Sequence, residues 1–161
     1  AGVTLVVIRK SWLEKANQGL PTMLSYATYS AKESLYNTPP VFAIYMVRNV
    51  LQWVKDEGGL AAMEKVNRAK GDRLYGVMTA HPDFYRCPVE EASRSYMNVV
   101  FRLPNEELEA KFVAEAKAAG MVGLKGHRSV GGCRASIYNA MPAEGVERLA
   151  EFMESFAASN G

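Results

Sequence analysis

The sequence predicts a mixed α/β protein with an α+β-like small domain, in which a small sheet carries helices packed on one face. Short apolar runs typical of strands alternate with longer segments whose apolar residues recur at helical spacing. The 161 residues suffice for one ordinary domain and a few neighbouring elements, and 48% hydrophobic with 22% charged residues is a globular composition. We place the small domain at residues 83–161 and the preceding elements at residues 1–82.

The first elements are a strand, a short helix and a long loop. The continuous β-branched run at residues 3–8 is typical of a strand that is covered on both faces. Ser11 then caps a short helix, which a glycine and a proline end near residue 20. Residues 22–40 are polar and aromatic without a helical or strand period, and a loop of that length is usually functional or held by a partner.

Two helices connect this loop to the small domain. The first begins after Pro40 and ends at a pair of glycines, and its apolar residues recur at helical spacing: Ile44, Val47, Leu51 and Val54. The second is expected over residues 60–80. Gly71 lies within it at a cost of about 1 kcal/mol relative to alanine, so we expect a bend or a close approach of another element there.

The small domain alternates strands and helices. Strands are expected at residues 97–103, 121–124 and 133–138. A first helix begins at Pro104 with a cap and two acidic residues, and a last helix begins at Pro142. The predicted buried faces of these helices are Leu108, Phe112, Val113 and Ala116, and Val146, Leu149, Met153 and Phe156.

Composition limits the partners of this protein. With 19 basic and 17 acidic residues the net charge is +2, so any anion recognition must be local, and neither nucleic acid nor membrane is an expected partner. The sequence contains no apolar run of about 18 residues, so no membrane span is predicted. Cys87 and Cys133 are too far apart for a CxxC motif and are expected to be idle thiols, without a metal site. The first residues do not resemble a secretion signal, so a cytoplasmic protein is expected.

A cationic, glycine-bearing segment is the clearest candidate site. Residues 125–134 place Lys125, His127, Arg128 and Arg134 beside three glycines. Arginine binds carboxylate and phosphate through two parallel hydrogen bonds, histidine adds a donor, and glycine lets the backbone approach a ligand closely. A glycine hairpin turn with solvated arginines would have the same composition, so the residues alone leave both interpretations open.

A second candidate site lies directly before a helix. Asn37 and Thr38 precede the prolines that open the first linking helix, where exposed N–H groups and the helix dipole attract phosphate. Pro40 removes one of those donors, so the two side chains would carry more of the binding. Simple entry into a helix, with Thr38 in the cap region, explains the same residues.

Five segments, taken in order, resemble the phosphoserine aminotransferase family, which belongs to class V and to the fold-type I enzymes that depend on pyridoxal 5'-phosphate (PLP). The segments are SLYNTPP at 34–40, FYRCPVE at 84–90, SRSYMNVVFRLP at 93–104, EAKAAGMVGLKGHRSVGG at 115–132 and RASIYNAMP at 134–142. None of them is a generic nucleotide or metal motif. The resemblance implies that residues 1–82 are a trailing strand, dimer loop and linking helices of a large PLP domain.

The resemblance also implies roles for both candidate sites. Asn37 and Thr38 would bind the phosphate of a PLP molecule held by the other subunit of a homodimer. His127 and Arg128 would bind the phosphate of the substrate, and Arg134 its carboxylate. The implied reaction transfers an amino group from glutamate to 3-phosphohydroxypyruvate, giving phosphoserine and 2-oxoglutarate in serine biosynthesis. Some family members also handle a phosphorylated hydroxythreonine precursor in pyridoxine and PLP biosynthesis.

The Schiff-base lysine of the family aligns before Ala1, so we expect no catalytic residue within the 161 residues and no activity of this chain alone. Lys125 adjoins the cationic segment, but the resemblance aligns it with a non-catalytic loop position. A rival interpretation is a non-enzymatic α/β module that binds a small phosphorylated or carboxylated effector through His127, Arg128 and Arg134. A nucleic-acid binder is disfavoured by the near-balanced charge.

Overall fold

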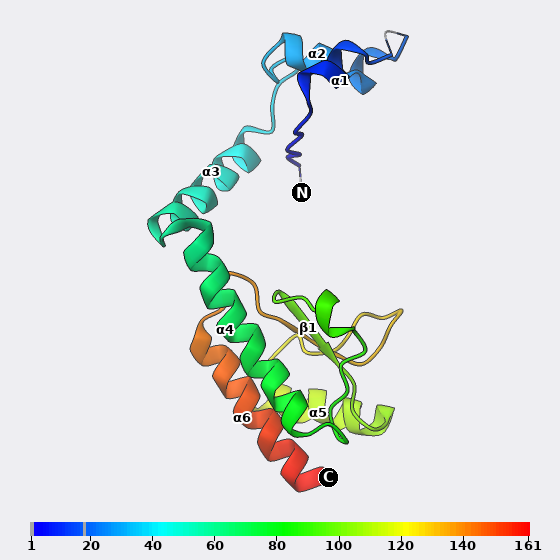
Figure 1. The fold of residues 1–161 in the computed structure, drawn as a ribbon, viewed down its shortest axis with the longest axis vertical. Helices are drawn as coiled ribbons and strands as arrows, with labels where there is room; N and C mark the ends of the chain where they lie inside the picture. The colour runs from blue at the N-terminus through cyan, green and yellow to red at the C-terminus, as the bar shows by residue number, and fades with distance from the viewer. Residues whose placement is uncertain (1, 18) are drawn as a thin grey trace. The chain divides into compact units, whose positions relative to one another are not determined.

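The structure is a computed structural model that describes residues 2–17 and 19–161. Ala1 and Gln18, which belong to the segment predicted over residues 1–82, lie outside the described residues. The chain divides into two compact units, Ala1–Asp56 and Glu57–Gly161, and each is described by itself (Figure 1).

The first unit contains short helices and one long helix. Its elements are α1 (Lys10–Glu14), the 3₁₀ turn η1 (Thr22–Leu24), α2 (Tyr26–Ala31) and α3 (Val41–Asp56). The strand predicted at residues 3–8 is wrong: the segment has no regular secondary structure, and side chains such as Leu5 are 90% exposed. A strand needs a hydrogen-bonded neighbour, and the described residues of this chain offer the segment none.

The predicted long loop is partly helical. Tyr29 of α2 joins two parts of this segment. Its hydroxyl donates to the Met23 sulfur at 3.6 Å, and its ring packs edge-on against Tyr36 with 6.4 Å between the ring centroids. Aromatic residues without a sequence period therefore hold short turns together. Residues 32–40 remain irregular up to the start of α3.

The helix α3 confirms the prediction of a linking helix after Pro40. No residue of α3 is buried, and Ile44, Val47 and Leu51 are between 44% and 58% exposed. The predicted apolar face therefore exists, but it is uncovered among the residues that the structure describes.

The second unit begins with α4 (Gly59–Ala80), which confirms the second linking helix. Gly58 precedes it in the left-handed conformation, at a φ of 96°, which glycine adopts without strain. Gly71 leaves α4 uninterrupted, and a methyl group on its Cα would overlap the ring of Tyr96. The glycine thus marks a close approach of another element and not a break.

The sheet of the second unit has two antiparallel strands, β1 (Asn98–Phe101) and β2 (Cys133–Ser136), with Val99 opposite Ala135 and Phe101 opposite Cys133. Those four residues are buried on the inner face of the sheet, whereas Asn98, Val100, Arg134 and Ser136 form the outer face and are half-buried. The strand predicted at residues 121–124 is wrong. Gly123 has a φ of 80°, which interrupts the extended run, and the pairing is reduced to a single bridge between Lys125 and Cys133.

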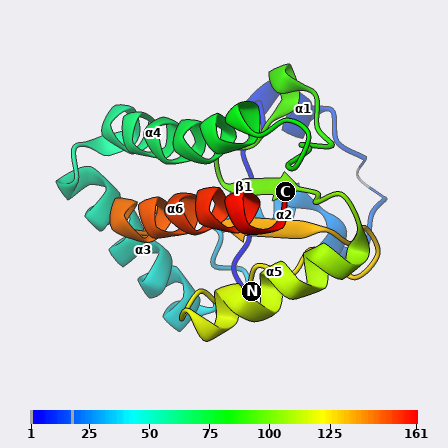
Figure 2. The ribbon, with the colours of Figure 1, turned by 90° about the horizontal axis from the view of Figure 1, so that it is seen from below.

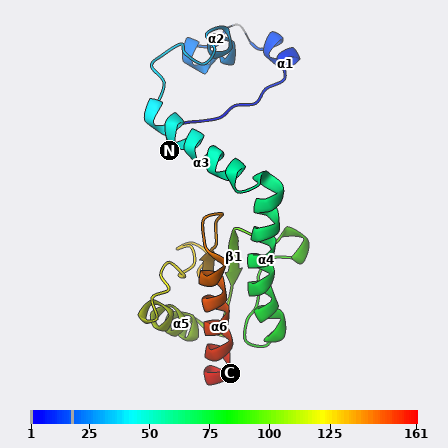
Figure 3. The same cartoon turned by 90° about the vertical axis from the view of Figure 1, so that its left-hand side faces the viewer.

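Within the second unit, helices cover the inner face of this sheet, which confirms the predicted fold class. The remaining elements are η2 (Glu91–Ser93), α5 (Glu106–Ala118) and α6 (Ala143–Asn160), and α6 lies between α4 and α5 (Figures 2 and 3). Asn105 caps α5 as predicted, because its side chain accepts from the Leu108 N–H at 2.9 Å. Edge-on aromatic pairs join the layers: Phe112 of α5 contacts Phe101 of β1 at 5.5 Å and Phe156 of α6 at 5.2 Å.

The helix α4 runs alongside α6 in the second unit (Figure 2). Arg73 of α4 binds Glu147 and Glu154 of α6, with nitrogen–oxygen distances of 2.7 and 2.8 Å. Within this chain the contacts therefore group α4 with residues 83–161. The predicted domain boundary between residues 82 and 83 concerns the complete protein and stays a prediction.

Candidate functional site

The cationic segment forms a hairpin that leads into β2. The Arg134 N–H donates to the Leu124 carbonyl at 2.8 Å, and the Gly126 N–H donates to the Gly132 carbonyl at 2.8 Å. Leu124 is buried, so one leg of the hairpin is anchored in the core and the other continues as β2. His127 and Arg128 at the tip are in this way tied to the strand that carries Arg134.

The tip of the hairpin is a tight turn that fixes His127. The His127 carbonyl accepts from the N–H groups of Val130 and Gly131 at 2.9 and 2.7 Å. The Nδ1 atom of His127 lies 2.6 Å from the Ser129 hydroxyl and accepts from the Ser129 N–H at 3.3 Å. Because a backbone N–H can only donate, this contact places the proton of a neutral imidazole on Nε2, which is then a donor to an anion.

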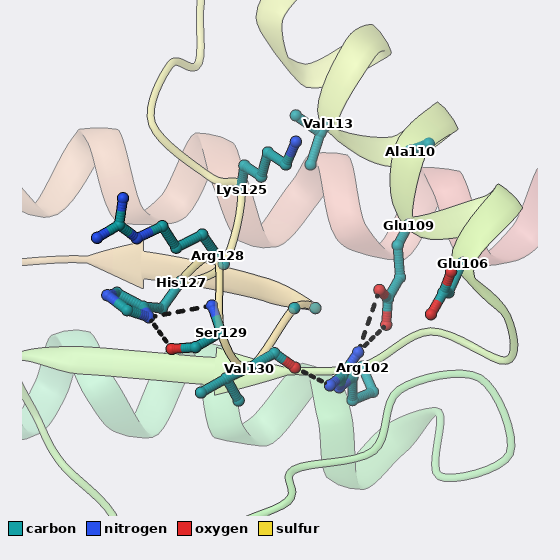
Figure 4. Close-up of a pocket in the computed structure, with 13 residues that line it drawn as sticks. Arg102, Glu106, Glu109, Ala110, Val113, Lys125, His127, Arg128, Ser129 and Val130 are labelled. Carbon is teal, nitrogen blue, oxygen red and sulfur yellow. Dashed lines mark hydrogen bonds and ion pairs between the residues drawn. The ribbon is translucent and has the colours of Figure 1, made fainter.

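Arg128 and His127 extend on the same side of the hairpin in Figure 4, whereas Arg102 lies on the other side. Both side chains of the tip are exposed, and among residues 2–17 and 19–161 no carboxylate forms an ion pair with either. The unpaired guanidinium of Arg128, beside the Nε2 donor of His127, can bind a phosphate group, because guanidinium and phosphate form two parallel hydrogen bonds.

Arg134 lies on the outer face of the sheet with part of its guanidinium out of contact with water. Its Nε atom is buried and has no hydrogen-bond partner in the described structure. Asn98, directly across from Ser136, accepts from the Ser136 hydroxyl at 3.1 Å and from the Tyr138 hydroxyl at 3.3 Å, so this face is polar. A buried N–H without an acceptor costs free energy, and a ligand carboxylate would satisfy it.

A hollow of about 730 Å³ separates the hairpin from α5. Arg102, at the end of β1, and Glu109 of α5 lie on its wall and form an ion pair at 3.4 Å, and Arg102 also donates to the Val130 carbonyl (Figure 4). Neither residue was among the candidates predicted from the sequence. A usable signal was present, because Glu109 shares the helical spacing of the buried Phe112 and Ala116.

Asn37 and Thr38 lie in the first compact unit and the hairpin in the second, so the two candidate sites are described separately. Both are exposed, and the Asn37 amide donates to the Thr38 carbonyl at 3.2 Å. They stand just before α3, a helix of 16 residues. Neutral hydrogen-bonding side chains at the positive end of such a helix fit a phosphate group such as that of PLP.

The chemistry of the remaining polar groups is limited. Burial raises the pKa of the Cys133 thiol to about 12, which keeps it protonated and unreactive. In the part of the chain that the structure describes, no group of three histidine, cysteine or acidic side chains could hold a metal ion. Across the same part, no helix is both long and apolar enough to cross a lipid bilayer.

Comparison with known proteins assigns the class. Residues 1–149 match the family model described as aminotransferase class-V, and the chain therefore belongs to the class-V aminotransferase family. The chain is 58% identical over 160 residues to the phosphoserine aminotransferase of Desulfotalea psychrophila, covering 99% of this chain and 44% of that protein. It is 57% identical over 156 residues to the phosphoserine aminotransferase of Geobacillus kaustophilus, covering 97% of this chain and 43% of that protein.

Solved structures agree with this class. The phosphoserine aminotransferase from Bacillus circulans subsp. alkalophilus superposes with a TM-score of 0.90 at 51% identity, over 96% of this chain and 43% of that one. The PLP-bound phosphoserine aminotransferase from Trichomonas vaginalis gives a TM-score of 0.82 at 36% identity, over 91% and 42%. These findings confirm the resemblance to phosphoserine aminotransferases, and the chain spans about 44% of the length of the relative from D. psychrophila.

Proposed function

We propose that this chain is the C-terminal, substrate-binding part of a phosphoserine aminotransferase. The complete protein transfers an amino group between glutamate and 3-phosphohydroxypyruvate, and it depends on PLP. In this proposal it acts in serine biosynthesis in the cytoplasm. Residues 1–82 belong to the large domain and residues 83–161 form the small domain. This proposal rests on the similarity to named relatives and on the fit of the hairpin to the substrate.

The observation that carries the proposal is the set of unpaired cationic and donor groups on one hairpin. Arg128 and Arg134 have no carboxylate partner within the described ranges, and the His127 ring is oriented by Ser129. Phosphoserine and 3-phosphohydroxypyruvate each carry a phosphate and a carboxylate. His127 and Arg128 therefore bind the phosphate, and Arg134 binds the carboxylate through the fork of its guanidinium.

The cofactor site is shared between two subunits in this proposal. Asn37 and Thr38 hydrogen bond to the phosphate of PLP held by the partner subunit of a homodimer, which gives a role to two exposed polar side chains at a helix start. When bound, PLP supplies the electron sink that the amino-group transfer requires. The residues of this chain bind and orient the anionic groups, and the lysine that anchors the cofactor belongs to another part of the protein.

The complete gene product and the 161-residue chain test the proposal together. The complete protein should carry a PLP chromophore that borohydride fixes to a lysine. It should form 2-oxoglutarate from glutamate over many turnovers only when 3-phosphohydroxypyruvate is supplied, because without this acceptor each cofactor yields at most one 2-oxoglutarate. The chain alone should form none. Transamination by the chain alone would refute the assignment of the cofactor lysine to another part. A complete protein without chromophore or turnover, which nevertheless binds phosphoserine, would instead support a non-enzymatic effector-binding module.

The same hairpin also fits a second phosphorylated substrate. A phosphorylated hydroxythreonine precursor of PLP biosynthesis also carries one phosphate and one carboxylate, so the three side chains fit it in the same way. Comparing kcat/KM for the two phosphorylated substrates decides which pathway the protein serves.

A further inference from the structure

Arg102 is fixed on one side by the sheet. Its backbone N–H and carbonyl pair with Arg86 at 2.8 and 3.0 Å, directly after β1. Its side chain extends to the hairpin, where the guanidinium donates to the Val130 carbonyl and pairs with Glu109 of α5 at 3.4 Å (Figure 4). One side chain thus joins the sheet, the helix α5 and the hairpin.

Two glycines of the hairpin allow its backbone to contact the Arg102 side chain closely. Gly131 and Gly132 have φ values of 74° and 70°, in the region that favours glycine. A Cβ on Gly131 would lie 3.0 Å from Nη1 of Arg102, and a Cβ on Gly132 would lie 2.9 Å from its Cδ. The backbone of the turn therefore rests directly on the Arg102 side chain, which would have to shift if either glycine carried a Cβ atom.

The hairpin tip has few other anchors. Residues 127–131 are exposed, and their remaining hydrogen bonds stay within residues 126–132. In the described part of the chain, Arg102 is the one side chain from outside this segment that hydrogen bonds to it. The two legs tie the hairpin to the core and to β2, whereas the internal hydrogen bonds of the turn fix the shape of the tip and not its tilt over the sheet.

We propose that Arg102 is a positioning residue for substrate phosphate, because it sets where His127 and Arg128 stand. The carboxylate of Glu109, which is only 9% exposed, forms an ion pair with the Arg102 guanidinium and holds it under the turn. Arg102 therefore supports the turn and does not bind the anion itself. Positioned groups lose much of their effect when shifted by about 1 Å. The inference rests on the proposed function, since it assigns Arg102 to the phosphate half of the same site.

The alternative is a purely structural anchor, whose loss would affect both substrates alike. The experiment is therefore made on the complete protein with Arg102→Met, which keeps the stem and removes the fork, and with Arg102→Lys, which keeps the charge. Arg86→Met is the matched control, because Arg86 pairs with Arg102 through the backbone while its side chain forms no ion pair in residues 2–17 and 19–161. Each half-reaction is followed by the absorbance of the bound cofactor, with phosphoserine and with glutamate as donors.

We expect Arg102→Met to lower kcat/KM for phosphoserine by roughly 10- to 100-fold, with glutamate changed by less than about 2-fold. Arg102→Lys should recover part of the loss, and Arg86→Met should match the parent. Hydrogen exchange should become faster at the Val130 and Gly131 amides in Arg102→Met only. Equal losses on both donors, or unchanged exchange in the hairpin, would overturn the inference.

Failure of the proposed function is distinguishable from failure of this inference. If the parent protein does not turn over phosphoserine, the proposed function fails, and with it the role of Arg102 in phosphate binding. The exchange measurement still decides whether Arg102 holds the turn, because that measurement needs no substrate.

Discussion

The ammonium nitrogen of Lys70 lies 2.9 Å from the carbonyl oxygen of Tyr138, and it also donates to the carbonyls of Ile137 and Met141 at 3.3 and 3.1 Å. Lys70 is in the middle of α4 and is 2% exposed, and its pKa is lowered by burial. The carbonyls belong to the connection between β2 and α6. A buried cation without a carboxylate partner therefore fixes the end of the strand that carries Arg134.

Replacing this lysine should destabilise the protein. Lys70→Met preserves length and removes the donors of three carbonyls, and a buried acceptor left without a donor costs about 1–3 kcal/mol. We expect a loss of about 2–3 kcal/mol in the free energy of unfolding, measured by denaturant unfolding of the complete protein. The control is Lys65→Met, an exposed position on the same helix, which should leave stability unchanged. Equal stability of Lys70→Met and the parent would show that water reaches those carbonyls.

Alanine substitutions at two glycines of α4 should change the free energy of unfolding in opposite directions. A methyl group at Gly71 would overlap the Tyr96 ring, whereas a methyl group at Gly76 meets nothing within 4 Å. Alanine is favoured over glycine in a helix by about 1 kcal/mol, so Gly76→Ala should stabilise by about 0.5–1 kcal/mol. Gly71→Ala should instead destabilise by about 1–3 kcal/mol, because the ring must move.

The comparison is read from unfolding midpoints measured in parallel. If both alanines stabilise, the ring of Tyr96 does not rest on Gly71, and the close contact between α4 and the segment before β1 is wrong. A stabilising Gly71→Ala therefore decides against this packing, whereas a destabilising one agrees with it.

The elements predicted best are those whose partners lie within the chain. The apolar stripe of α6 is buried as predicted, from Val146 to Phe156, because α4, α5 and the sheet cover it. The run at residues 3–8 has an equally strong strand pattern and forms none, since strands depend on neighbours that a local pattern does not reveal. The short strand predicted at residues 121–124 does not form, because Gly123 has a left-handed φ that interrupts the extended backbone.

The sequence singles out the residues that we propose as anion ligands, but it does not single out the residues that support them. Cationic residues beside glycines are visible in the sequence, so His127, Arg128 and Arg134 could be named without coordinates. Arg102 and Glu109 could not, because their roles arise from contacts between β1, α5 and the hairpin. Glu109 occupies a helix position where spacing calls for an apolar residue, and a charge at such a position indicates a buried partner.

Alkaline pH should destabilise the protein, in part through Cys133. Burial raises the pKa of this thiol from 9.0 to about 12, and burial raises the pKa of Tyr75 from 10.0 to about 12. Between pH 9 and 12 the folded state thus holds protons that the unfolded state has lost, so stability falls as pH rises through this window. Lys70, whose pKa is lowered, acts in the opposite direction and offsets part of the fall.

The variant Cys133→Ala isolates the thiol. It should lose about 1 kcal/mol at neutral pH through the missing sulfur, yet show a shallower decline above pH 9, with roughly 2 kcal/mol less pH-dependent loss at pH 11. Cys87→Ala, at the half-buried second cysteine, is the control for thiol removal. Parallel pH profiles for the parent and Cys133→Ala would contradict the assignment.

Variants of the three side chains proposed to bind anions should affect the two amino donors differently. Arg134→Ala removes the proposed carboxylate ligand, and since phosphoserine and glutamate both carry that group, kcat/KM should fall by about 10- to 100-fold for both donors. His127→Ala and Arg128→Ala remove the proposed phosphate ligands, so the loss should fall mainly on phosphoserine. Half-reactions of the complete protein, followed by cofactor absorbance, measure each donor separately.

Arg148→Ala serves as the control, because Arg148 lies on α6 and donates to the Ala119 carbonyl at 3.3 Å, away from the hairpin. The pattern across donors is more informative than the size of any one loss, because a general loss of folding lowers both rates together. If all three site variants weakened glutamate and phosphoserine equally, phosphate and carboxylate would not be divided between the hairpin tip and β2. The unpaired Nε of Arg134 would then have to be satisfied by a group other than the substrate carboxylate.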